Sequence, residues 1–205
     1  EVNVVPPTIF YHNGPAIVVN FIGSPEFKPI QGTSLMAATN TNWDVLLDSS
    51  NNAYYLLVGD GWITSTDPLN TSWTATSAPG GVAQLPDDEN WSQIKTATPG
   101  ANVDPVPRVF ASSTPSELIV TEGEPTFSPI PGAGLMYVTN SPATLIYFGR
   151  EDEYYFLVAG RWFRAPALDG PWSAATVDLQ NEFATIPEDP AMGLVLASLQ
   201  DPAAE

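Results

Sequence analysis

The sequence has no cysteine and a single histidine, His12. These absences exclude disulfides, thiolate zinc sites and cysteine nucleophiles, and they leave little for histidine-based metal or acid–base chemistry. Basic residues are also scarce, with 6 lysines and arginines against 23 acids and a net charge of -17. Nucleic acid and anionic membranes require clustered positive charge, so neither is expected as a partner. No apolar run approaches the roughly 18 residues of a transmembrane helix. Together these absences argue against an enzyme and against a metal or other cofactor.

The chain is rich in apolar and aromatic residues. Of its 205 residues, 43% are hydrophobic and 11% aromatic, which is enough to build a core. Abundant Thr, Ser, Asn and Pro with few lysines is typical of a secreted or surface-exposed bacterial protein. The sequence begins at Glu1 without a methionine or an apolar leader. We therefore expect a fragment of a longer surface protein, located outside the cell or at its surface, with the periplasm as the alternative.

The chain is an internal duplication. A shift of 100 residues aligns its halves, and ten of the eighteen positions over residues 23–40 are identical to their equivalents in 123–140. The same shift places residues 54–58 on 154–158 and Trp62 on Trp162. We expect an N-terminal arm (1–14), a first β repeat (15–103), a proline-rich connector (104–107), a second β repeat (108–200) and a C-terminal tail (201–205).

Each repeat carries β signals. Residues 43–48 and 53–59 are apolar runs on either side of a Ser-Asn cluster, which predicts a hairpin. A Gly-Asp-Gly turn then leads into residues 61–65, giving a three-stranded meander whose central strand is apolar on both faces and so buried. Helical turns are indicated only near residues 87–94 and 179–186. The predicted fold is all-β, with two homologous antiparallel units in tandem, each a small barrel or sandwich.

Aromatic residues recur in both repeats, and flat rings held on a sheet are suited to stacking on sugar faces. Residues 154–172 contain an apolar strand, a glycine turn, Phe163-Arg-Ala and a final Gly-Pro-Trp172. This segment resembles the chitin-binding type of carbohydrate-binding module, families five and twelve, and repeats of secreted bacterial proteins labelled carbohydrate-binding. The resemblance implies a small β-sheet and a sugar-binding role. The candidate ligand-binding residues are Trp43, Tyr54, Tyr55, Trp62, Tyr154, Tyr155, Trp162, Phe163 and Trp172.

Each candidate also has a structural interpretation. Trp62, Trp162 and Trp172 recur in both repeats, as core residues do. Trp43 has no aromatic equivalent in the second repeat, where Ala143 stands, and this favours a functional role for it. The acidic triplets 87–89 and 151–153 are typical of solvated turns. Calcium is the alternative, but neither triplet has the alternating spacing of a calcium loop.

The sequence therefore predicts a non-catalytic secreted or surface module that binds polysaccharide or a cell-surface glycan through exposed aromatic residues. Two units on one chain would gain avidity for a repetitive polymer. The alternative is a structural repeat of an extracellular appendage or surface layer, in which strands pair with neighbouring copies of the same chain.

Overall fold

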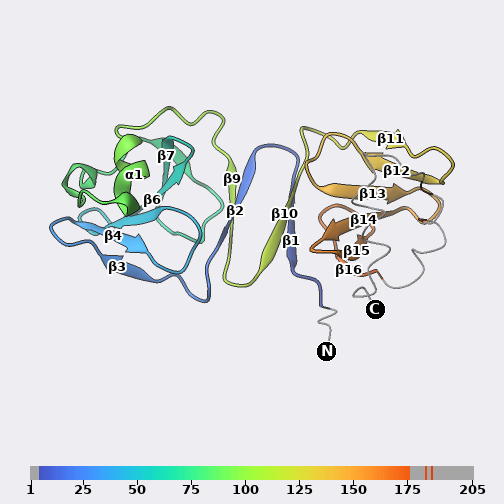
Figure 1. Ribbon diagram of the computed structural model, residues 1–205, viewed down its shortest axis with the longest axis horizontal. Helices are drawn as coiled ribbons and strands as arrows, with labels where there is room; N and C mark the ends of the chain where they lie inside the picture. The colour runs from blue at the N-terminus through green and yellow to red at the C-terminus, as the bar shows by residue number, and fades with distance from the viewer. Residues whose placement is uncertain (1–4, 176–182, 184–185, 187–205) are drawn as a thin grey trace. The chain divides into compact units, whose positions relative to one another are not determined.

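The computed structural model describes residues 5–175, Phe183 and Ile186. In this part of the chain the secondary structure is mostly β, with one short α-helix and two 3₁₀ turns. The chain forms two compact units (Figure 1): the first unit is Pro15–Ser116, and the second unit combines Glu1–Gly14 with Glu117–Glu205. The predicted all-β class with two similar antiparallel units is confirmed. Among the described residues, no helix is both long enough and apolar enough to cross a membrane.

A six-stranded antiparallel sheet forms the first unit, with its strands adjacent in chain order. The strands are β3 (Phe27–Pro29), β4 (Leu35–Ala38), β5 (Val45–Asp48), β6 (Ala53–Val58), β7 (Gly61–Ser65) and β8 (Thr74–Thr76). The predicted three-stranded meander corresponds to β5, β6 and β7, and three further strands extend it. Asn52 ends the β5–β6 turn with a φ of 54°, and Gly59 follows β6 with a φ of 62°. Both values lie in the left-handed region that Asn and Gly tolerate best.

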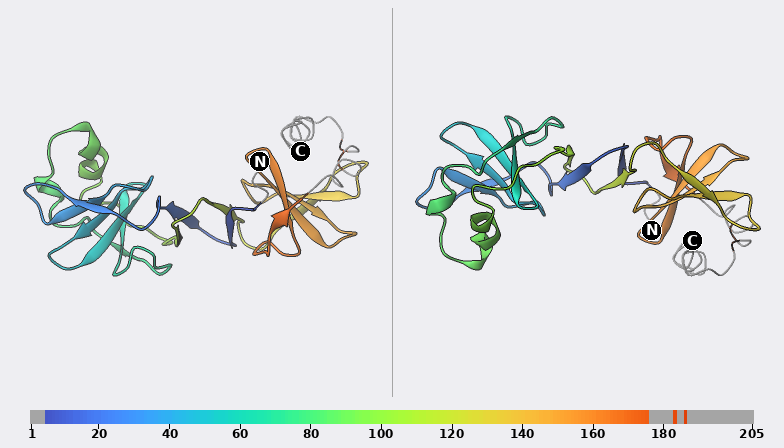
Figure 2. Two further views of the ribbon diagram at one scale, coloured as in Figure 1. Left: turned by 90° about the horizontal axis from the view of Figure 1, so that it is seen from below. Right: turned by 90° about the horizontal axis from the view of Figure 1, so that it is seen from above.

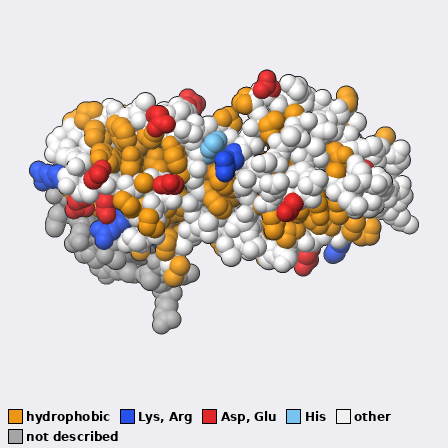
Figure 3. Space-filling model, turned by 180° about the vertical axis from the view of Figure 1, so that it is seen from behind, with side chains coloured by type: hydrophobic (Ala, Val, Ile, Leu, Met, Phe, Trp, Pro, Cys, Tyr) orange, Lys and Arg blue, Asp and Glu red, His pale blue; other side chains and the backbone are white. Residues whose placement is uncertain are grey.

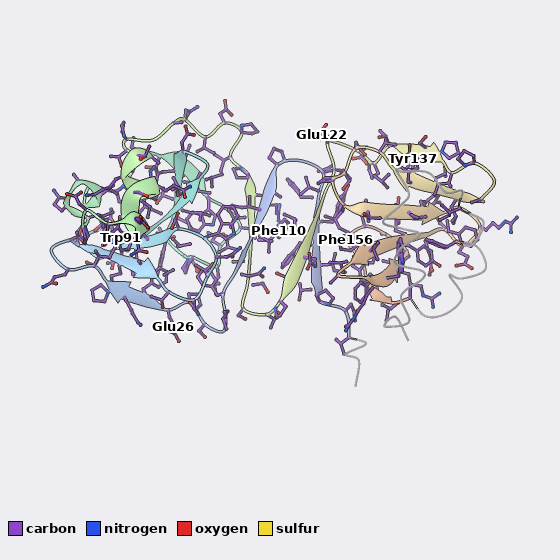
Figure 4. All side chains as sticks on the ribbon, viewed as in Figure 1. Glu26, Trp91, Phe110, Glu122, Tyr137 and Phe156 are labelled. Atoms are coloured by element: carbon purple, nitrogen blue, oxygen red, sulfur yellow. The ribbon has the colours of Figure 1, made fainter. Side chains whose placement is uncertain are left out.

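The central strand β6 is covered on both faces, as its apolar sequence predicts. Leu57 points to the face that packs with Trp62 and Ile94, and Leu56 points to the face that packs with Val19 and Val109. The first of these faces is covered by the helical segment, which contains η1 (Val82–Gln84), η2 (Glu89–Trp91) and α1 (Ser92–Thr96). Figure 2 shows this segment on one side of the sheet, and Figure 4 labels Trp91 on it. The sheet therefore supports two separate cores.

The helical turn predicted near residues 87–94 is present, because the Asp88 side chain accepts a hydrogen bond from the backbone N–H of Asn90 at 2.9 Å and caps η2. The equivalent prediction at 179–186 lies outside the described residues except for Phe183 and Ile186. Both of these side chains are buried against the second sheet.

The second unit repeats the same layout with a second six-stranded antiparallel sheet. Its strands are β11 (Phe127–Pro129), β12 (Leu135–Val138), β13 (Thr144–Phe148), β14 (Glu153–Val158), β15 (Arg161–Ala165) and β16 (Ser173–Ala174). Trp162 and Tyr155 pack on one face with Phe183, while Phe156 and Leu145 pack on the other face with Ile119. The predicted tail at 201–205 and the end of the second repeat lie outside the described residues.

In the remaining four strands, each strand pairs with a strand of the other repeat, which the sequence did not predict. They are β1 (Thr8–His12), β2 (Ala16–Asn20), β9 (Arg108–Ser112) and β10 (Ser116–Val120). β2 pairs in parallel with β9, and β1 pairs with β10. Because β1 and β9 are equivalent under the 100-residue shift, each unit contains the first strand of the other repeat. Residues 1–14, expected as an arm, thus contribute a strand to the second unit. Near the expected connector at 104–107, Val103 and Val106 pack onto the first unit.

Candidate ligand-binding site

The structure places the predicted aromatic residues mainly inside the two units. Trp62 is fully buried, and Trp162, Phe163 and Tyr155 are each no more than 6% exposed. The other five candidates are half-buried: Trp43, Tyr54, Tyr55, Tyr154 and Trp172. A ligand platform needs ring faces that solvent can reach, so the half-buried residues are the only members of the predicted set with a surface to offer.

Trp62 and Trp162 are both buried in the core of their unit. The Trp62 indole N–H donates to the Ala97 carbonyl at 2.6 Å. Trp162 contacts Phe183 edge-to-face, with ring centroids 5.1 Å apart. These positions correspond under the 100-residue shift: Trp62 packs in a cluster with Ile94, and Trp162 packs in a cluster with Phe183 and Ile186.

Trp43 and Trp172 lie on the opposite faces of their sheets and are also held in place by hydrogen bonds. The Trp43 indole N–H donates to the Val18 carbonyl on β2 at 2.8 Å, so this ring attaches the β2–β9 pair to the sheet. The Trp172 indole N–H donates to the Leu168 carbonyl at 3.3 Å, and its ring meets Phe156 edge-to-face at 5.9 Å. These contacts indicate that Trp43 and Trp172 have a structural role.

One aromatic group does reach the surface. We call Phe127, Tyr147 and Tyr154 the aromatic strip; its rings come from β11, β13 and β14. Tyr147 and Tyr154 are directly opposite each other in the β13–β14 register, with centroids 5.0 Å apart. Phe127 is 5.4 Å from Tyr147 and 6.3 Å from Tyr154, and it is 39% exposed. Neighbouring planes are tilted by 38–48°, so the rings form a twisted surface.

The position of the strip follows from the alternation of strands. Tyr154 is two residues from Phe156, and Tyr147 is two residues from Leu145, so all four side chains point to the same face of the sheet. Phe156 and Leu145 are buried in the cluster that includes Ile119 of β10. Tyr154 packs against this cluster, and Tyr147 and Phe127 continue the apolar face outward from it. Figure 3 shows hydrophobic side chains gathered on the visible surface of this unit.

A carboxylate lies at the edge of the strip. The Tyr147 hydroxyl donates to Asp152 Oδ1 at 2.7 Å, and this bond is the main reason that the pKa of Tyr147 is raised. The pKa of Tyr154 is raised chiefly by burial. Both phenols therefore stay protonated at neutral pH. The strip thus offers ring faces together with acceptor oxygens of Asp152, which is the combination that a hydroxyl-bearing ligand can use.

The other face of β14 shows a different use of tyrosine. Burial and a hydrogen bond to Glu151 raise the pKa of Tyr155 to about 12, and its hydroxyl donates to Glu151 Oε2 at 3.0 Å. Tyr155 also contacts Phe183 edge-to-face at 5.7 Å. This tyrosine therefore belongs to the core of the second unit.

The first unit has a reduced version of the strip. Phe27 and Tyr54 have ring centroids 5.4 Å apart, and their equivalents Phe127 and Tyr154 are 6.3 Å apart. Leu47 stands where the second repeat has Tyr147 and pairs with Tyr54 in the β5–β6 register. The middle ring and its carboxylate partner are thus specific to the second unit.

The first unit has instead a polar hollow of about 460 Å³. It is lined by Gly32, Thr33, Ser34, Asp48, Ser50, Gly80, Gly81 and Gln84. Burial raises the pKa of Asp48, but hydrogen bonds from Ser50 and Ser34 outweigh it and lower the pKa overall. Asp48 Oδ1 accepts from the Ser50 N–H at 2.9 Å and from the Ser50 hydroxyl at 2.6 Å. The carboxylate is ionised at neutral pH and holds the β5–β6 turn, whereas the equivalent Phe148 is a core residue.

The acidic triplets lie at η2, in the β13–β14 turn and at the start of β14, and several of their carboxylates have local partners. Asp87 forms an ion pair with Lys95, and Asp88 caps η2. Glu151 and Asp152 accept from the two tyrosines described above. Across residues 5–175, Phe183 and Ile186, no three acidic or histidine side chains are grouped so that they could hold a metal ion.

Phe127 and Tyr147 are not among the residues that the sequence predicted. Tyr147 could have been found, because the hairpin predicted for residues 43–48 and 53–59 recurs 100 residues later and brings Tyr147 opposite Tyr154. Phe127 carried a weaker signal, the repetition of Phe27 at the same spacing. Comparison with protein-family models, with curated proteins and with solved structures found no match to this chain. The site is therefore interpreted from its own geometry.

Proposed function

We propose that the protein is a non-catalytic module that binds a polysaccharide or cell-surface glycan, and that the aromatic strip of the second unit is the surface that it uses. The observation that supports this best is the strip itself, three contacting rings on a rigid sheet with Phe127 39% exposed. Sugar rings present C–H groups on their faces and hydroxyls at their edges, so they match ring faces flanked by an acceptor. The tilt between the rings suits a polymer whose units rotate along its length.

The charge of the chain narrows the ligand class. With 23 acids against 6 bases, the protein repels anionic polymers, nucleic acids and anionic membranes over the Debye length. A neutral glycan carries no such penalty. Asp152, beside Tyr147, supplies a carboxylate acceptor for a ligand hydroxyl. The strip and the net charge together favour an uncharged, polyhydroxylated polymer.

A binding role without catalysis is supported by the chemistry of the strip. Its side chains are a phenylalanine and two tyrosines whose pKa values are raised, so neither phenol is a nucleophile at neutral pH. The single histidine, His12, lies in β1, where its carbonyl accepts from the Thr121 N–H at 3.1 Å. A secreted or cell-surface location in a bacterium, with the periplasm as the alternative, fits a glycan ligand and stays part of the proposal.

Retention on immobilised polysaccharides tests the proposal. The full chain is run by affinity electrophoresis through gels containing chitin derivatives, cellulose derivatives, xylan, mannan or glucan, beside Phe127→Ala and the control Thr74→Ala. Thr74 is an exposed β8 residue of the first unit. We expect at least one polymer to retard the full chain and the control equally. Phe127→Ala should lose about tenfold in affinity, or about 1.4 kcal/mol. No retardation by any polymer, or full retention by Phe127→Ala, would contradict the proposal.

A further inference from the structure

We propose that the place beside β10, which β1 of the same chain fills in the structure, also takes β1 of a second copy, so that two copies assemble by exchanging this strand. The proposal is independent of glycan binding. It rests on the pairing of β1, β2, β9 and β10 and on the length of the segments between them.

The first two strands of a repeat do not pair with each other. β2 pairs in parallel with β9, from Ala16 opposite Arg108 to Asn20 opposite Ser112. A parallel pair needs a crossover connection of about a dozen residues or more. Only residues 13–15 connect β1 to β2, and only residues 113–115 connect β9 to β10. A single repeat therefore cannot place its first strand in parallel beside its own second strand, and the donor strand has to come from another repeat.

The two donor strands are equivalent, and so are the two acceptor places. β1 and β9 are 100 residues apart, as are β2 and β10. In the first unit, Val109 of β9 is fully buried against Val19 and Ile63. In the second unit, Ile9 of β1 packs at the equivalent position, in the cluster that contains Ile119. The contacts at the place beside β10 depend only on the sequence of the strand that fills it. Either copy of the chain can therefore supply that strand.

An empty place would be costly, so each place needs a donor. Ile119 and Thr121 are both fully buried in the second unit. Thr121 donates its N–H to the His12 carbonyl at 3.1 Å, and its hydroxyl lies 3.1 Å from the Tyr11 hydroxyl. Removing β1 would expose the apolar cluster and leave the buried Thr121 N–H without its acceptor. A unit that has not received β1 from its own chain is therefore competent to take it from another.

Concentration decides which donor fills the place. Within one chain, β1 is tethered to its acceptor at an effective concentration in the millimolar range. Closure within one chain is thus favoured when dilute protein folds. When the protein folds at high concentration, β1 of a second copy competes, and reciprocal exchange gives a dimer with the same strand contacts as the monomer.

The absence of cysteine makes a direct test available. The β2–β9 register pairs Val18 with Phe110, and the equivalent positions of the other pair are Leu118 and Phe10; Figure 4 labels Phe110. The single variants Phe10→Cys and Leu118→Cys are mixed, unfolded together, refolded at rising concentration and treated with a short thiol–thiol cross-linker. The matched control is the mixture of Thr64→Cys and Thr74→Cys, neighbours in β7 and β8 of one unit.

We expect a covalent heterodimer from the Phe10→Cys and Leu118→Cys mixture, rising at least fivefold over the control as concentration increases. The double variant refolded at high dilution should cross-link within one chain. A mixture that never exceeds the control would overturn the proposal. Because the substitutions could impair folding, the unsubstituted chain is also refolded at the same concentrations and its mass measured by light scattering. A dimer fraction that grows with concentration is expected, and monomer alone throughout would equally overturn the proposal.

Discussion

The two units share several large core residues and differ at positions that shape a surface or a hollow in one of them. Leu35 and Leu135, 100 residues apart, are each no more than 1% exposed, and Trp62 and Trp162 fill the same place on their sheets. Three of the positions at which the repeats differ lie in or just before β5 and β13: Trp43 against Ala143, Leu47 against Tyr147, and Asp48 against Phe148. The shared positions specify a scaffold, and the Leu47/Tyr147 and Asp48/Phe148 differences give the second unit a third ring and the first unit a polar hollow.

The largest effect on stability is expected at the core tryptophans that the two units share. Trp62→Ala and Trp162→Ala should each lower the free energy of unfolding by about 3–5 kcal/mol, because each removes a large buried ring. Denaturant unfolding followed by circular dichroism measures both variants. Nearly equal losses would confirm that the two positions have the same role, whereas a loss below about 1 kcal/mol at either would show that its indole is not part of a core.

The Asp48 and Phe148 difference predicts a pH-dependent effect in the first unit alone. Asp48→Ala should cost about 1–3 kcal/mol at neutral pH, because the Ser50 N–H and hydroxyl lose their acceptor. The pKa of Asp48 is lowered from 3.8, so its stabilising contribution is present above that pH and is lost as the pH falls through the lower folded-state value.

Unfolding of wild type and Asp48→Ala between pH 7 and pH 2.5 checks this sign. The gap between the two proteins should narrow as the pH falls below 3.8, and a gap that widens in acid would contradict the assignment. Phe148→Ala is the matched control, because a cavity carries no such pH dependence.

The Leu47 and Tyr147 difference is the one that concerns binding. Tyr147→Leu gives the second unit the residue of the first and removes the middle ring of the strip, so affinity for the polysaccharide should fall about tenfold, or about 1.4 kcal/mol. Leu47→Tyr restores a third ring beside Tyr54 and should raise retention. Affinity electrophoresis compares both variants with wild type. Unchanged retention by Tyr147→Leu would show that the strip is not the binding surface.

The smallest effect is expected at Trp43. Trp43→Phe keeps an aromatic ring and loses the hydrogen bond to the Val18 carbonyl, so it should lower stability by about 0.5–1.5 kcal/mol. Because that ring packs against the β2–β9 pair, glycan retention should not change. A loss of retention with stability unchanged would instead make Trp43 a ligand contact, as its lack of an aromatic equivalent suggested.

The duplication, the meander and the buried central strand could be predicted from the sequence, because each depends on local patterns. Residues 54–58 are apolar on both faces of the strand, and residues 49–52 have the composition of a turn. The pairing of β1 with β10 within the chain could not be predicted. It is non-local, and residues 8–12 alone specify no partner. The surface was also hard to predict, because burial of Trp62 and exposure of Phe127 depend on what covers each face of the sheet.

Mapping of the bound ligand onto the chain distinguishes the aromatic strip from every other surface of the protein. Backbone amide shifts of the isotope-labelled protein are recorded by NMR while an oligosaccharide of the retained polymer is titrated. We predict that the largest shifts fall on β11, β13 and β14 around Phe127, Tyr147 and Tyr154, with saturation at the same ligand concentration. Shifts confined to residues near Trp43 or the polar hollow of the first unit, or no shifts at millimolar ligand, would contradict the account.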